Sequence, residues 1–133
     1  MLVEGVGGLC VPLTDREDLR DLVVRIGLPV VIVGRAAIGG VNQALLTVEA
    51  LKSRSIPIMA LVLNQACPAG KGPDAPAQRD STVQLVKERS GVPVVGPLPY
   101  EAAFVEDWEA GLSKLALDHG IDALADLLTE RDA

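Results

Sequence analysis

The chain has 133 residues, of which 49% are hydrophobic and 23% are charged, a composition typical of a folded protein with an apolar core. Its 12 basic and 18 acidic residues give a net charge of −6, the wrong sign for binding nucleic-acid phosphates, and only three aromatic residues are present for base stacking. We therefore expect no nucleic-acid partner. The length predicts a single domain covering residues 1–133.

The predicted elements alternate between helix and strand. Residues 19–26 carry apolar side chains at helical spacing, Gly27 suits the end of that helix, and residues 30–33 form the unbroken apolar run of a buried strand. The same order then recurs as a helix around 42–54, a strand around 58–63, a helix around 79–89 and a short strand at 94–95. This alternation through short loops predicts an α/β fold, a mainly parallel sheet with flanking helices.

The two ends of the chain add further predicted elements. Residues 2–3 are expected to end one more strand, and an apolar stripe over residues 112–115 precedes a closing helix around 121–128. Residues 101–133 carry nine acidic and two basic residues. This imbalance fits a solvated helical face better than a binding surface.

The N-terminus and the cysteines predict a cytoplasmic protein. No basic region or long apolar stretch opens the chain, so we expect neither a signal peptide nor a membrane partner. Cys10 and Cys67 have neither the CxxC spacing nor the Cys/His clustering of a zinc site, which favours a reducing compartment and inert thiols.

Residues 66–77 are rich in proline and glycine, which predicts either a mobile lid or a loose connection. Lys71 lies in this loop, but the phosphate-binding motif GxxxxGK[ST] would need Gly at 65 and Ser or Thr at 72, where this chain has Gln65 and Gly72. His119 is the only histidine, and its place before a glycine near a helix end favours a surface cap over a catalytic base. No nucleophile constellation is predicted.

Ligands of open parallel sheets bind at the carboxyl ends of the strands, so polar residues at these junctions are candidates for a site. Glu4 precedes a glycine-rich turn over residues 5–8, where N–H groups can approach a phosphate and the carboxylate can hold Mg²⁺; a tight turn after an ordinary acidic residue fits equally well. Residues 34–42 place small residues before a helix start. That segment suits a carboxylate or phosphate, unless Asn42 simply caps the helix.

Two further junctions carry groups suited to a nucleotide base. Asn64 ends the second strand, and its amide either pairs with an adenine edge or forms a turn. Residues 96–101 follow the third strand as a proline-rich segment that is either one wall of a base pocket or a simple turn.

Taken in order, these segments resemble dethiobiotin synthetases. The matching segments are residues 3–8 (VEGVGG), 12–13, 28–30, 38–42 (IGGVN), 45–47, 62–64, 93–94 and 96–99 (GPLP). They cover nearly all of this chain but only the C-terminal part of that family's domain. The resemblance implies a P-loop NTPase fold and a homodimer. It also implies a ligase that uses ATP, Mg²⁺ and CO₂ to close the ureido ring of dethiobiotin on 7,8-diaminopelargonate in biotin biosynthesis.

The resemblance also implies roles for individual residues. Glu4 would be a magnesium ligand, and Asn64 would read the adenine. The other residues implied at the nucleotide are Gly5, Val6, Gly7, Gln65, Pro99, Tyr100, Glu101 and Glu106. The residues implied to hold the substrate carboxylate, across the dimer interface in the family, are Ile38, Gly39, Gly40, Val41 and Asn42. No residue is singled out as catalytic.

One part of the family pattern has no counterpart in this chain, namely the N-terminal GxxxxGK[ST] loop with its companion lysine and second magnesium carboxylate. Phosphoryl transfer depends on positioning and on cations around the γ-phosphate, so we expect no activity from this chain alone. It is a part of an enzyme that a P-loop polypeptide completes, a non-catalytic α/β module that associates with itself or binds a partner, or a fragment of a longer reading frame. In each case the edge of the sheet near residues 2–3 would be uncovered.

Overall fold

The computed structural model describes residues 2–5, 7–68 and 76–129. Within these residues three parallel strands form one sheet in the order β1-β2-β3, with β1 at Val30–Arg35, β2 at Ile58–Asn64 and β3 at Val94–Leu98. The predicted α/β architecture with a parallel sheet is therefore confirmed. A parallel sheet requires a crossover between successive strands, and helices supply it here.

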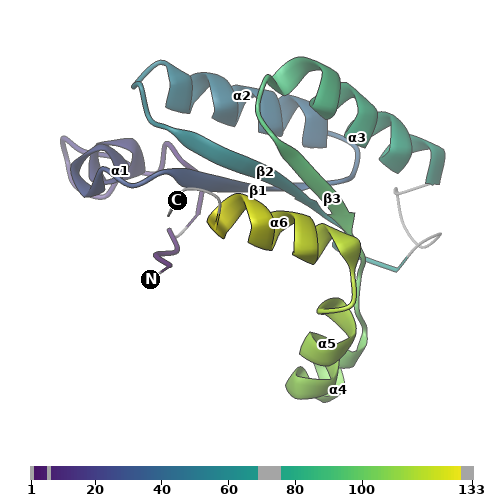
Figure 1. Cartoon of the computed structure of the whole chain (residues 1–133). Coiled ribbons are helices and arrows are strands. Elements are labelled where there is room, and N and C mark those ends of the chain that lie inside the picture. Colours follow the sequence, from purple (N-terminus) through teal and green to yellow (C-terminus); the bar gives the residue numbers. More distant parts are fainter. Residues whose placement is uncertain (1, 6, 69–75, 130–133) are drawn as a thin grey trace.

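Helices cover the two faces of the sheet unequally. Helix α2 (Gly40–Lys52) connects β1 to β2, α3 (Pro76–Ser90) precedes β3, and both lie on the same face (Figure 1). Helix α6 (His119–Thr129) lies on the opposite face, where it packs against β2 and β3. Among the residues that the structure describes, the first face therefore has two helices and the second face has one.

Alternation along β2 builds a core on each face. Leu61 and Leu63 face α2 and α3, where the buried side chains include Val48, Leu51 and Val86. Val62 points to the other face and packs with Val95, Leu98 and the apolar side of α6. Because β2 is buried on both faces, its sequence is almost continuously apolar, as expected for the central strand of a parallel sheet.

Helix α1 (Leu19–Ile26) lies at the amino ends of the strands (Figure 1). Asp18 accepts a hydrogen bond from the Arg20 N–H at 2.9 Å, and Asp21 accepts one from the Asp18 N–H, so the helix begins with a reciprocal capping box. It ends at Gly27, whose φ of 69° is left-handed, as the sequence predicts.

Two short helices extend beyond the end of β3. Helices α4 (Ala103–Glu106) and α5 (Trp108–Leu115) pack against each other and project away from the sheet (Figure 1). The Phe104 and Trp108 rings lie 4.9 Å apart between centroids. A Cβ at Gly111 would lie 2.5 Å from the Phe104 ring, so a residue without a side chain is needed at this contact.

The structure corrects the expected strand at residues 2–3. Residues 2–5 form no regular secondary structure, and Leu2 is 87% exposed. A strand requires a neighbour that bonds its backbone, and no strand of the described residues lies beside this segment. The predicted loop at 66–77 lies partly outside the described residues, at 69–75, and so does Lys71. No helix among the described residues is long and apolar enough to cross a membrane.

Candidate functional site

The carboxyl ends of the three strands lie level with one another. In the register of the sheet Arg35 is beside Asn64, and Asn64 is beside Leu98. Two backbone hydrogen bonds extend this alignment past the strands: the Ala36 N–H donates to the Asn64 carbonyl at 2.9 Å, and the Gln65 N–H donates to the Leu98 carbonyl at 3.0 Å. The segments that follow the three strands therefore begin at one edge of the sheet.

Asn64 presents its side chain at the centre of this edge. The residue is exposed, and its amide forms no hydrogen bond with a described residue. The next residue, Gln65, is half-buried, and Tyr100 is half-buried beyond the end of β3, while Pro99 is exposed. An amide with one acceptor and two donors can match the edge of a purine, so the residues present fit the base of a nucleotide.

Glu101 has a structural role in this region. Its Oε1 accepts a hydrogen bond from the Ala103 N–H at 2.8 Å and from Lys114 Nζ at 3.4 Å. The backbone hydrogen bond from Ala103, helped by the charge of Lys114, lowers the pKa of Glu101 below its ordinary value. Glu101 thus holds the start of α4 and links it to α5, whereas Glu106 lies exposed at the end of α4.

The start of α2 lies next to the same edge. Gly39 has a left-handed φ of 83°, and a Cβ at Gly40 would collide with the carbonyl oxygen of Arg35. These two constraints require glycines here and set the helix start at Gly40, so the alternative that Asn42 caps this helix is wrong. The N–H groups of Val41 and Asn42 have no acceptor among the described residues. Ile38, just before the helix, is exposed.

Arg35 is a residue of this edge that sequence reasoning missed. It ends β1 beside Asn64, and its Nη2 donates to Gln43 Oε1 of α2 at 3.4 Å. Its guanidinium brings a positive charge to the strand ends. A signal was present in the sequence, because Arg35 is the first charged residue after the apolar run of the first predicted strand.

The structure does not bring Glu4 together with Asn64. A Cβ at Gly5 would lie 2.8 Å from Leu19 Cδ2, so this segment lies against the first residue of α1. Figure 1 shows residues 2–5 on the α1 side of the molecule, whereas β3 leads into α4 at the other end of the sheet. Gly7 forms a turn with a φ of 76°, and Val6 lies outside the described residues.

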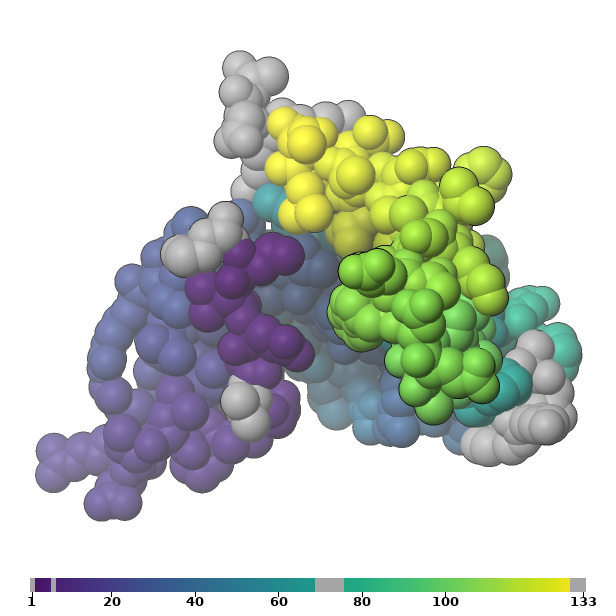
Figure 2. Space-filling model, turned by 90° about the horizontal axis from the view of Figure 1, so that it is seen from below, coloured from purple at the N-terminus to yellow at the C-terminus, as the bar shows by residue number. Residues whose placement is uncertain are grey.

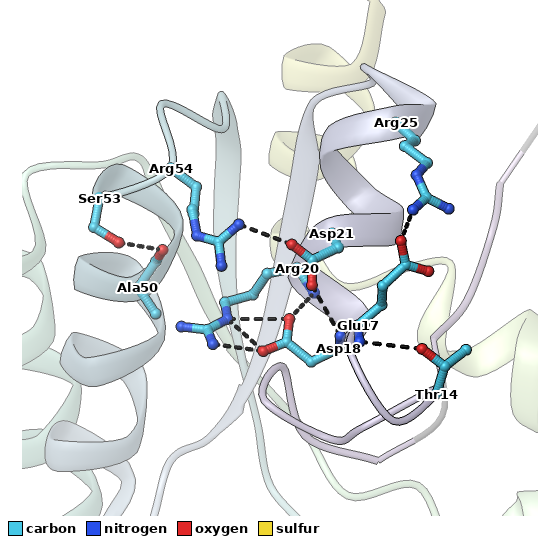
Figure 3. Close-up of polar contacts among 9 residues, drawn as sticks. All are labelled: Thr14, Glu17, Asp18, Arg20, Asp21, Arg25, Ala50, Ser53 and Arg54. Atoms are coloured by element: carbon cyan, nitrogen blue, oxygen red, sulfur yellow. Dashed lines mark hydrogen bonds and ion pairs between the residues drawn. The ribbon is translucent and has the colours of Figure 1, made fainter.

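The polar side chains around α1 are paired with each other. Figure 3 shows Asp21 facing Arg54, with Asp21 Oδ1 and Arg54 Nη1 2.9 Å apart, while Glu17 pairs with Arg25. A hollow of about 370 Å³ lies beside Thr14–Glu17, and a second of about 110 Å³ lies between α1 and the segment before β2. Both hollows lie away from the strand carboxyl ends. The described residues contain no group of three or more His, Cys, Asp or Glu side chains that would hold a metal ion.

These observations fit the base of a nucleotide and its phosphates to different extents. The strand ends offer an amide for the base and a positive charge from Arg35. The described residues offer no cluster of magnesium ligands, and the chain contains no GxxxxGK[ST] loop for the phosphates. The described residues therefore fit the base of a nucleotide better than they fit its phosphates.

Comparison with known proteins identifies the family. A family model described as an AAA domain matches residues 1–107. This match and the parallel α/β sheet define the class of protein, and the chain belongs to this AAA domain family with its P-loop NTPase-like fold.

Individual relatives show which members of this family the chain resembles. An ATP-dependent dethiobiotin synthetase BioD of Anaeromyxobacter sp. (strain Fw109-5) is 57% identical over 67 residues, 50% of this chain and 30% of the relative. One of Thermodesulfovibrio yellowstonii is 40% identical over 107 residues, 75% of this chain and 43% of the relative. A biotin biosynthesis bifunctional protein BioCD of Bordetella avium is 31% identical over 119 residues, 86% of this chain and 23% of the relative. The predicted dethiobiotin-synthetase resemblance is confirmed, and the chain spans less than half the length of these relatives.

Proposed function

We propose that this chain supplies the base-binding side of an ATP-dependent ligase of the dethiobiotin-synthetase type, acting in biotin biosynthesis. The observation that carries this proposal is the level alignment of Arg35, Asn64 and Leu98, which puts an amide with no partner among the described residues at the edge where parallel sheets bind ligands. The names of the relatives support the choice of reaction.

Several described residues of the edge have a defined task in this proposal. The Asn64 amide donates to and accepts from the adenine edge, and Gln65, Pro99 and Tyr100 limit the space around the base. The N–H groups at the start of α2, which have no acceptor among the described residues, hold the carboxylate of 7,8-diaminopelargonate, because unbonded N–H groups and the helix dipole stabilise an anion. When bound, ATP with Mg²⁺ supplies the phosphoryl group that activates the carbamate formed from CO₂.

The section of the dethiobiotin synthetases that this chain does not span completes the phosphate side of the site. Without a GxxxxGK[ST] lysine, this chain has no residue of that motif to stabilise charge on the γ-phosphate, so it is inactive alone. In the completed protein, residues 2–5 pair as a strand and carry Glu4 to the strand ends, where it becomes a magnesium ligand. The homodimer of the family and a cytoplasmic location belong to this proposal as well.

Complementation tests the function. The probe is the section of the Thermodesulfovibrio yellowstonii enzyme that lies outside the matched 107 residues, co-expressed with this chain. The assay supplies 7,8-diaminopelargonate, bicarbonate, Mg²⁺ and ATP and measures dethiobiotin by mass spectrometry, with the solution mass of the complex recorded alongside. We expect no product from either polypeptide alone and product from the pair. Glu4→Gln should raise the magnesium concentration that the pair requires. Absence of product from the pair would contradict the proposed ligase.

A second candidate is a non-catalytic α/β module that associates with itself or binds a partner. It is favoured by the 71% exposure of Val33 in the middle of β1, because an exposed apolar strand is typical of a protein–protein interaction surface. Calorimetry with Mg-ATP on the purified chain separates the two candidates. Measurable binding favours the ligase part, and no binding favours the non-catalytic module.

A further inference from the structure

The segment with α4 and α5, residues 99–118, leaves the sheet and returns to it at the same residue. It starts directly after Leu98, the last residue of β3, and ends where α6 begins. A Cβ at Gly120, the second residue of α6, would lie 2.7 Å from Leu98 Cδ2, so the start of α6 packs on Leu98. Both ends of the α4–α5 segment are therefore fixed at the neighbour of Asn64 in the register of the sheet.

Between these two ends the α4–α5 segment is held by contacts of its own. Among the described residues, neither apolar core contains a residue of α4 or α5. Figure 2, which views the molecule from the side to which these helices project, shows them in green as a lobe beside the yellow α6. Inside the lobe the Phe104 ring contacts Trp108 and lies over Gly111. Contacts within the segment therefore determine how it stands relative to the strand ends.

The contact between Glu101 and Lys114 joins α5 to the base of this segment. Glu101 Oε1 accepts hydrogen bonds from the Ala103 N–H at 2.8 Å and from Lys114 Nζ at 3.4 Å. The Glu101 side chain is 22% exposed, whereas the Lys114 side chain is 62% exposed. Lys114 thus reaches the partly enclosed carboxylate from the solvent side, and its replacement leaves no cavity in a core.

The residues held by this contact are the ones proposed to limit the space around the base. Pro99 and Tyr100 are the two residues between Leu98 and Glu101. The Gln65 N–H donates to the Leu98 carbonyl at 3.0 Å, so this short stretch starts beside the residue that follows Asn64. A proline with its fixed φ and an anchor at each end leave the stretch little freedom. Its position therefore depends on Glu101 and, through Glu101, on Lys114.

We propose that Lys114 is a positioning residue for the base of the nucleotide: it holds the Glu101 carboxylate, which in turn sets Pro99 and Tyr100 against the base that Asn64 binds. This inference rests on the proposed function and gives Lys114 no contact with the nucleotide. When a site is competent in only a fraction of the molecules, affinity falls by that fraction. Loss of Lys114 should therefore weaken binding of the base without abolishing it.

A direct contact of Lys114 with the phosphates is the alternative, because a lysine ammonium is a common phosphate partner. The 3.4 Å contact with Glu101 instead directs the ammonium to a carboxylate of its own segment. The two roles differ in the ligand that they affect. Adenosine has the base and no phosphates, so a positioning role changes the affinities for adenosine and for Mg-ATP alike, whereas a phosphate contact changes the affinity for Mg-ATP alone.

Titration of the purified chain with adenosine and with Mg-ATP, followed by NMR, tests the proposal. Lys114→Met removes the charge and keeps a stem of similar length. We expect its Kd to rise by about threefold for both ligands, as for the loss of a partly exposed ion pair. Lys114→Arg should restore the wild-type Kd, because a guanidinium also donates to a carboxylate. A rise for Mg-ATP alone would assign Lys114 to the phosphates and overturn the proposal.

Lys87→Met is the matched control. It changes the net charge equally, and Lys87 is exposed in the last turn of α3, the helix that leads to the amino end of β3. This variant should bind both ligands as the wild type does, and the urea midpoints of the two methionine variants should agree, because α4 and α5 lie outside the cores. A lower midpoint of Lys114→Met at wild-type affinity would make the contact with Glu101 merely structural and overturn the proposal.

A double-mutant cycle tests whether Lys114 acts through Glu101. Glu101→Gln removes the charge that Lys114 holds and keeps an oxygen that accepts from the Ala103 N–H. We expect Lys114→Met to weaken adenosine binding in the wild type and to have little further effect in the Glu101→Gln variant, because contacting residues are not additive. The same loss in both backgrounds would overturn the proposal.

The complementation assay separates the positioning role from the proposed function. Adenosine binding that depends on Lys114, in a chain whose co-expressed pair makes no dethiobiotin, supports the positioning role and contradicts the ligase. Dethiobiotin formation with the same KM for ATP in the wild-type and Lys114→Met pairs supports the ligase and contradicts the positioning role. Absence of adenosine and Mg-ATP binding to the wild type, both alone and in the pair, would contradict both proposals.

Discussion

The two ends of the sheet differ in whether their polar groups form hydrogen bonds and ion pairs within the described residues. At the amino end, charged side chains around α1 pair with each other, as in the 2.5 Å contact of Arg20 with Asp18 and the 2.9 Å contact of Arg54 with Asp21 (Figure 3). At the carboxyl end, the Asn64 amide and the first free N–H groups of α2 find no acceptor or donor among the described residues.

This difference indicates that polar groups at the amino end stabilise the fold, whereas those at the carboxyl end are available to bind a ligand. Paired groups fix the position of α1 against the sheet and leave little hydrogen-bonding capacity for a ligand. Unpaired groups at the surface remain hydrated and contribute little to folding, but they are available to a ligand of matching shape. Substitutions at the amino end should therefore change stability, and substitutions of exposed side chains at the carboxyl end should change binding.

One residue at the carboxyl end, Gly40, is required for folding, and its substitution should reduce stability more than any other change considered below. Gly40→Ala would place a Cβ against the carbonyl oxygen of Arg35, and backbone cannot yield as a flexible side chain can. We expect the free energy of unfolding to fall by about 3 kcal/mol, the upper end of the range for overpacking, measured by urea denaturation.

Gly8→Ala is the matched control for this substitution. A Cβ at Gly8 would meet no atom within 4 Å, so its stability should stay within about 0.5 kcal/mol of the wild type. If Gly40→Ala were as stable as Gly8→Ala, the close approach of α2 to β1 would not constrain the fold.

Asn64, in contrast to Gly40, should contribute to binding and not to stability. Asn64→Ala removes an amide with no partner within the described residues, so stability should be unchanged, while affinity for Mg-ATP should fall by roughly 1–3 kcal/mol. Calorimetry on the purified chain measures the affinity. Gln84→Ala is the control, because that amide lies on α3 and bonds Glu88 at 2.6 Å. Equal affinity of Asn64→Ala and wild type would remove Asn64 from the site.

Local signals in the sequence predicted most of the fold. The left-handed Gly27 at the end of α1 and the apolar run of β2 depend on nearby residues, so periodicity and turn chemistry were sufficient. The helix start at Gly40 was missed because it depends on a contact with Arg35 across the tertiary structure. The strand at residues 2–3 was predicted wrongly because a strand forms only beside a partner, and sequence pattern alone does not supply one.

The candidate site was predictable to the extent that parallel topology determines it. Strands of one parallel sheet end at the same edge, so the closeness of Asn64 to the segment after β3 followed from the alternation of helices and strands. Glu4 depended on a strand that the described residues do not form. The ion pair of Asp21 with Arg54 joins residues 33 positions apart, and no local pattern indicates it.

At the amino end of the sheet, Asp21 should make a small contribution to stability that depends on pH. The hydrogen bond from the Asp18 N–H, followed by that from Arg54, lowers the pKa of Asp21 below the ordinary value of 3.8. A carboxyl group with a lowered pKa in the folded state stabilises the protein above its unfolded pKa, and this contribution disappears as the pH falls through the folded pKa. The urea midpoint of the wild type should therefore decline below about pH 4. Asp21→Asn should have a lower midpoint at pH 7 and a shallower decline, because the residue no longer titrates.

Asp80→Asn is the control, because the Asp80 carboxylate pairs with the adjacent Arg79 on α3, and this variant should follow the wild-type profile. If the urea midpoints of Asp21→Asn and wild type changed with pH in parallel, the pairing at α1 would not stabilise the amino end. The contrast between the two ends of the sheet would then rest on the carboxyl end alone.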